Sequence, residues 1–216
     1  MNDWQTLARY RNAERAFEEL QMTFENDWQI CHQYGLFQLA TGRTRDAMVS
    51  LREASQLHPL SMSVKVDFAR AHWYAGQAER AIEDAKRLRE RYDDPVLVRG
   101  LLIDIYEQQQ RYDLAAAVDD GLDVDPAASA EDYFRVRRSR LSDVPYGAFG
   151  KSLNSAILQS RVNGGLTDRE LADLTDPMPP MLPLLLSVHP AFASARGLPR
   201  ASEILPPRAY DAPGVA

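Results

Sequence analysis

Cysteine, histidine and long hydrophobic runs are scarce in this chain of 216 residues. The single cysteine, Cys31, excludes an internal disulfide framework and any cysteine-rich zinc site. The four histidines do not show the spacing of a metal-ligand motif such as HxxxH. We therefore expect neither a metal nor another cofactor. We expect Cys31 itself to be a small buried residue rather than a nucleophile.

The sequence also lacks a segment that would lead it to or across a membrane. Residues 1–30 are polar and charged, without the apolar core of a signal peptide. The longest apolar run near the other end, residues 183–188, is far too short to span a bilayer. These features predict a cytoplasmic protein that does not bind membranes.

Basic residues are outnumbered by acidic ones. The 25 Lys and Arg residues against 31 Asp and Glu give a net charge of -6 and a pI of about 5.3. This balance argues against a nucleic-acid binder, which needs a basic field to contact phosphates. The one basic cluster, residues 135–140, is interpreted as the solvated face of a helix. Because no GxSxG elbow, phosphate-binding glycine loop or paired-carboxylate motif stands out, we expect neither an enzyme nor a catalytic residue.

An internal repeat organises the first 130 residues. Ala13, Ala47, Ala81 and Ala115 follow one another at intervals of 34 residues, and so do Gly42, Gly76 and Gln110. An alanine is required where two helices cross closely, and glycine accepts the left-handed conformation that ends a helix. The repeat predicts an all-α fold, a short right-handed solenoid of helical hairpins.

These residues resemble the tetratricopeptide repeat (TPR) family. The resemblance implies full repeats at 28–61, 62–95 and 96–129, which end near Pro59, Pro95 and Pro126. It also implies a partial repeat over 1–27, whose apolar positions are Trp4, Ala13, Phe17 and Leu20.

Two positions depart from the family pattern. Gln38 stands where the family usually has an aromatic residue, and Ile103 where it has a small one. The packing around these two residues is therefore expected to differ.

The alanine register stops beyond residue 130, because Phe149 stands where another small residue would be due. The pattern there predicts helices near 130–141 and 146–162. We expect residues 130–205 to form a non-repeat helical extension, whose apolar piece Leu182–Phe192 caps the solenoid. Residues 206–216 are expected to be a flexible tail.

Two stretches give a narrower resemblance. Residues 68–76, FARAHWYAG, and residues 181–192, MLPLLLSVHPAF, are similar to parts of the C-terminal TPR sensor or effector domains of CadC-like winged-helix bacterial regulators. Because the chain opens midway through a repeat, we expect it to be a part of a longer protein, with a capping half-repeat as the alternative. DNA would then be bound only by a separate winged-helix domain that this chain does not contain.

The resemblance also implies which residues contact a partner. Solenoids of this type bind on the concave face, which the first helix of each repeat lines. These positions are Gln29, His32, Leu36, Leu39 and Ala40 in the first full repeat, Ser63, Val66, Arg70, Trp73 and Tyr74 in the second, and Leu97, Gly100, Asp104, Glu107 and Gln108 in the third. Arg70, Trp73 and Tyr74 are the sharpest cluster, since Arg, Trp and Tyr most often anchor interfaces. The alternative is that Trp73 and Tyr74 pack against neighbouring helices.

Two functions remain from the sequence. The first is the ligand- or partner-sensing part of a bacterial transcriptional regulator, which binds a peptide, a protein loop or a small effector in the groove. The second is a free-standing TPR adaptor or secretion-type chaperone that holds a client peptide there. Homodimer formation stays open in both.

Overall fold

A computed structural model describes residues 3–92, 96–119, 125, 129–143, 165–169, 171 and 192–202. Over these ranges the chain forms helices and no strands, which confirms the predicted all-helical class. The chain divides into two compact units, one containing residues 1–58 and 167–216 and the other residues 59–166. Each unit is described by itself.

In the part of the first unit that the structure describes there are three long helices and two short C-terminal ones. Helix α1 spans Asp3–Thr23, α2 spans Trp28–Ala40 and α3 spans Thr44–Leu57, and α2 contacts both of the others. The Asp27 carboxylate caps α2 by accepting hydrogen bonds from the N–H groups of Gln29 and Ile30. The short helices η2, Ser194–Gly197, and α12, Pro199–Ser202, contact each other.

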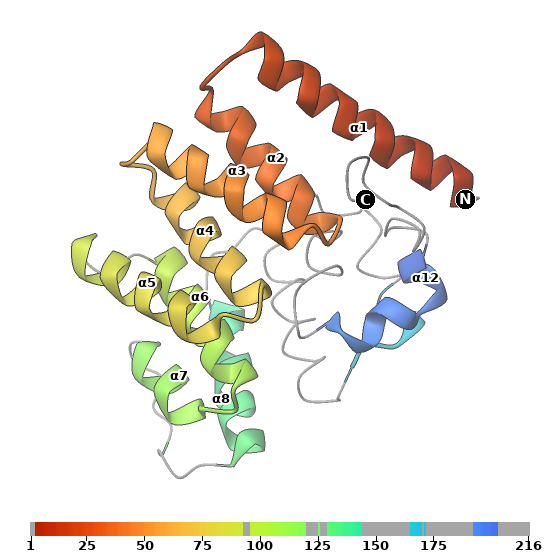
Figure 1. Cartoon of the computed structure of the whole chain (residues 1–216). Helices are drawn as coiled ribbons and strands as arrows, with labels where there is room; N and C mark the ends of the chain where they lie inside the picture. Colours follow the sequence, from red (N-terminus) through yellow and green to blue (C-terminus); the bar gives the residue numbers. More distant parts are fainter. Residues whose placement is uncertain are drawn as a thin grey trace. The chain divides into compact units, whose positions relative to one another are not determined.

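The described residues of the second unit form five helices that follow one another in space (Figure 1). They are α4, Met62–Tyr74; α5, Ala78–Arg91; α6, Val96–Gln108; α7, Tyr112–Val118; and α8, Ala130–Asp143. Each helix contacts the next one along the chain, and α4 also contacts α6. The first helices of consecutive hairpins therefore lie side by side.

The helix boundaries follow the period seen in the sequence. Helices α2, α4, α6 and α8 begin 34 residues apart, at Trp28, Met62, Val96 and Ala130. Helices α3, α5 and α7 keep the same interval. The period in helix positions thus continues one helix beyond the alanine repeat, since α8 begins where a fourth unit would.

The turn between the two helices of each hairpin has one conformation. Its backbone φ is positive at Gly42 (79°), Gly76 (79°) and Gln110 (59°). At each of these the N–H donates to the carbonyl three residues back, and the following N–H donates to the carbonyl five residues back. This Schellman-type pattern satisfies the last carbonyls of the first helix, and it repeats at all three turns.

The predicted small residues lie where the helices cross. Ala47, Ala81 and Ala115 are completely buried. At Gly35 an added Cβ would come within 2.7 Å of the Leu51 Cγ, so α2 and α3 approach as closely as glycine allows. The repeat therefore reflects close helix packing, as expected.

Helix α8 belongs to the core of the second unit. Its Tyr133 and Phe134 join a cluster of buried residues from α4 to α7 that includes Trp73, Leu102 and Tyr106. Helix α8 confirms the helix predicted near 130–141. The predicted helix at 146–162, most of the expected cap Leu182–Phe192 and the tail at 206–216 lie outside the described residues. Phe192, at the end of that cap, is fully buried and belongs to the first unit.

Candidate binding face

The predicted groove residues are divided between the two units. Gln29, His32, Leu36 and Leu39 lie on α2, in the first unit. His32 and Leu39 are buried, Leu36 is half-buried and Gln29 is exposed. The remaining residues lie on α4 and α6, which are in contact within the second unit, so only these two helices form one described surface.

Several predicted groove residues on α4 and α6 belong to the core. Trp73 is only 6% exposed and packs in the hydrophobic cluster together with Val66. Tyr74 is half-buried against the same cluster, and its ring lies 5.1 Å from that of Trp73. These contacts match the alternative, in which Trp73 and Tyr74 pack against neighbouring helices.

The accessible part of this surface is a stripe along α6 and the adjacent side of α4. Leu97, Gly100, Asp104 and Gln108 recur at helical spacing, which places them on one side of α6. Leu97 is 48% exposed, Gln108 is exposed, and an added Cβ at Gly100 would meet no atom within 4 Å. On α4, Ser63 is also exposed. We call this stripe, with Ser63, Asp67 and Arg70 of α4, the α4–α6 face.

Arg70 links the two helices electrostatically at the centre of the α4–α6 face. Its Nη1 lies 2.7 Å from the Asp67 Oδ1, and its side chain is 23% exposed. Burial by itself lowers the pKa of the Arg70 guanidinium, but Tyr74, Asp67 and Asp104 together raise this pKa above its ordinary value. The neighbouring groups therefore outweigh the effect of burial on this guanidinium.

Glu107 forms a second polar cluster, which ties α8 to α6 and to the end of α7. The Tyr133 hydroxyl donates to the buried Glu107 Oε1 at 2.9 Å, and the Arg137 Nε lies 3.3 Å from the same oxygen. The Arg137 Nη1 lies 3.0 Å from the Asp119 Oδ2. Glu107 is thus a structural residue. Arg137 is largely buried in this cluster, whereas the sequence predicted that the run at 135–140 forms a solvated helix face. Arg135 is exposed, as that role requires.

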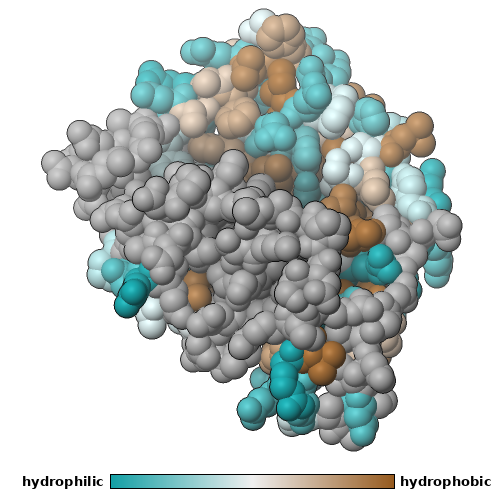
Figure 2. Space-filling model, turned by 180° about the vertical axis from the view of Figure 1, so that it is seen from behind, coloured by the Kyte–Doolittle hydropathy of each residue, from teal (hydrophilic) through white to brown (hydrophobic). Residues whose placement is uncertain are grey.

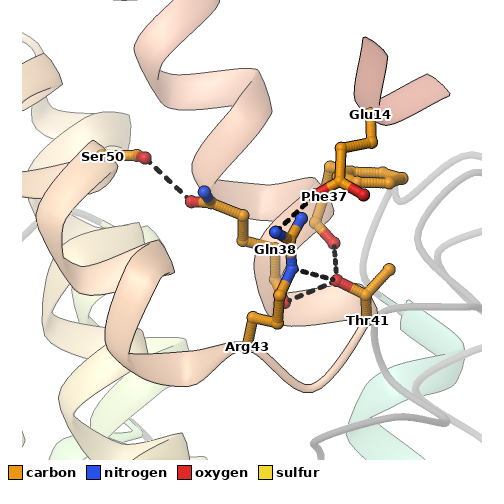
Figure 3. A network of polar contacts seen from close by, with 6 residues as sticks. All are labelled: Glu14, Phe37, Gln38, Thr41, Arg43 and Ser50. Atoms are coloured by element: carbon orange, nitrogen blue, oxygen red, sulfur yellow. Dashed lines mark hydrogen bonds and ion pairs between the residues drawn. The ribbon is translucent and has the colours of Figure 1, made fainter. Parts of the chain in front are cut away.

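The first unit contains a polar network that sequence reasoning did not find (Figure 3). Arg43, in the turn after α2, pairs with Glu14 of α1 at 2.5 Å and lies over the rings of Tyr34 and Phe37. Nearby, the Ser50 hydroxyl of α3 donates to the Gln38 side-chain oxygen at 2.8 Å. The sequence does not predict the Glu14–Arg43 ion pair, because the two residues are far apart along the chain and belong to no motif.

Cys31 is buried, as predicted. Burial raises the pKa of its thiol, and the charge of Glu53 adds to this effect, so the reactive thiolate is disfavoured. In the described part of the chain no group of three or more His, Cys, Asp and Glu residues is placed to hold a metal ion. None of the helices described there is long and apolar enough to cross a membrane.

The described surface offers both polar and apolar contacts. On the face that Figure 2 shows, hydrophobic residues reach the surface among hydrophilic ones. In the second unit the large apolar residues that are exposed include Leu60, Val96 and Leu97. The last two begin α6, at one end of the α4–α6 face.

Comparison of the sequence with protein-family models finds no family that matches the chain. Comparison with curated proteins finds no relative either.

Proposed function

We propose that this chain is a tetratricopeptide-like interaction module that binds an extended segment of a partner on the α4–α6 face. The observation that carries the proposal is the open space at Gly100, on the helix pair that the resemblance to the tetratricopeptide repeat family assigns to binding. Glycine in the middle of a helix costs about 0.5–1 kcal/mol relative to alanine. An open approach for a partner is a functional reason for this glycine.

The neighbouring residues support the same use. Leu97 and Ser63 are exposed on the same face, while buried residues of α4 and α6, among them Val66, Trp73 and Leu101, pack the two helices into one hydrophobic cluster. A rigid helical surface with accessible apolar and polar groups suits recognition of an extended segment. The proposal concerns the binding step, which a regulator and an adaptor share.

The test uses a library of short random peptides displayed on phage and selected on the whole chain. Gly100→Tyr places a ring in the open space and should weaken binding of the selected peptides at least about tenfold, a difference of 1.4 kcal/mol. Gly100→Ala adds only a methyl group there and should leave binding close to that of the wild type. Arg80→Tyr, which places a tyrosine at an exposed position of α5, is the matched control.

Circular dichroism shows whether each variant remains helical. Peptides that bind the Gly100→Tyr variant as tightly as the wild type would contradict the proposal. Failure of the wild type to select any peptide family would contradict it as well.

A further inference from the structure

The charges on the α4–α6 face indicate which segments it accepts. Asp67 and Asp104 both act on the single guanidinium of Arg70. Lys65 and Arg99 stand two positions beyond Ser63 and Leu97, about 200° around their helices, and so lie on the opposite sides of α4 and α6. Among the described residues of this face, carboxylates outnumber cations.

We propose that the partner segment carries a lysine or arginine side chain that lies against Asp67 and Asp104, and an aliphatic side chain that lies against Leu97. This inference rests on the proposed function and specifies the chemistry of its ligand. The complementary charges favour a basic segment over an acidic one, because a like charge brought to this surface would be repelled.

The state of Arg70 supports the negative sign of this surface. Its neighbours raise its pKa although burial acts in the opposite direction. Asp67 and Asp104 carry two formal negative charges against the one positive charge of Arg70, so the face keeps a net charge of -1 that attracts a further cation from solvent. The net charge of -6 on the chain adds a long-range attraction for basic partners.

The spacing of the face sets the pattern expected in the segment. Leu97 and Asp104 are about 10 Å apart along the axis of α6, since each residue rises 1.5 Å. An extended peptide covers this distance with about three residues. Gly100 lies between them, where its lack of a side chain lets the peptide backbone approach. The ligand pattern is therefore an aliphatic residue and a basic residue about three positions apart.

The experiment takes the selected peptides and replaces their basic residue with glutamine. On the wild-type chain this replacement should weaken affinity about tenfold, measured by fluorescence anisotropy with labelled synthetic peptides. On the Asp67→Asn variant and on the Asp104→Asn variant the same replacement should have a smaller effect, because one of the two carboxylates that face the basic residue is gone. Asp113→Asn, which removes an exposed charge at the start of α7, is the matched control and should behave as the wild type.

The peptide replacement requires no change in the protein, so it remains decisive even where a variant folds poorly. Selection of acidic or uncharged peptides overturns this inference and leaves the proposed function standing. An equal effect of the replacement on the wild type and on both Asp variants overturns it as well. Peptides that bind without regard to Gly100→Tyr overturn the proposed function itself.

Discussion

Gly42, Gly76 and Gln110 occupy the same place in three consecutive hairpin turns. The turn requires a left-handed backbone, which glycine adopts freely and which costs other L-residues about 1–2 kcal/mol. The first two turns meet this requirement with glycine, and the third keeps the same hydrogen bonds with glutamine. The third turn is therefore strained at Gln110.

Replacing Gln110 with glycine should relieve this strain and raise the free energy of unfolding by about 0.5–1 kcal/mol. The converse variant, Gly76→Ala, should lose about 1–2 kcal/mol. An added Cβ at Gly76 meets no atom within 4 Å, so the lower stability of the Gly76→Ala variant would come from its backbone conformation alone. Urea denaturation followed by circular dichroism measures the free energy of unfolding of both variants. A Gln110→Gly variant that is less stable than the wild type would contradict the strain at this turn.

At the scale of the helical hairpin, one contact between the two helices is made in three different ways. The first hairpin uses the buried hydrogen bond of Ser50 to Gln38. The second places the buried His72 Nδ1 3.0 Å from the Asp84 Oδ2, at the equivalent positions. The third has the apolar residues Tyr106 and Val118 there, both in the core. The polar residue at position 38, unusual for the resembled family, is thus accommodated by a polar partner across the hairpin.

Removing one member of such a buried pair should lower the free energy of unfolding more than replacing both members by apolar residues. Ser50→Ala leaves the Gln38 amide oxygen without its donor and should lower the free energy of unfolding by about 1–3 kcal/mol. Adding Gln38→Leu should recover most of that loss, because apolar side chains then occupy both positions, as in the third hairpin. Thermal denaturation of both single variants and the double variant forms the cycle that measures this coupling. Additive losses would show that the hydrogen bond does not determine the packing of α2 and α3.

At the scale of a whole unit, α8 is held to α6 and α7 by the Glu107 cluster. Burial raises the pKa of Tyr133 above its usual range, and Arg137 only partly opposes this. The neutral hydroxyl is the form that donates to Glu107. Ionisation of Tyr133 would place a second negative charge against that buried carboxylate.

Stability of the second unit should therefore fall at alkaline pH. The pKa of Tyr133 is higher in the folded chain than in the unfolded chain. The stabilisation that Tyr133 contributes is thus complete below its pKa in the unfolded chain, about 10, and is lost as the pH rises above that value. Tyr133→Phe should cost about 1–3 kcal/mol at neutral pH, and its difference from the wild type should shrink above about pH 10. Denaturant unfolding over a pH series tests this. A difference that stays constant with pH would contradict it.

The amino-acid sequence determined the local structure of this protein. The repeated alanines and turn residues placed the helices α2–α7 at their observed interval, because close crossings and left-handed turns accept few residue types. The sequence also predicted the burial of Cys31, a lone cysteine without a basic partner nearby in the chain. By contrast, the roles of Trp73 and Glu107 depended on which side chains surround them in space.

The tertiary structure decided what no local pattern encodes. It paired Arg43 with Glu14 and Arg137 with Glu107 and Asp119, contacts between residues far apart in the chain. It also divided an evenly spaced series of helices into two compact units, one of which includes the described C-terminal residues 192–202. The physical reason is that periodicity fixes which residues face a neighbouring helix. Which charges and rings meet there depends on how the helices pack.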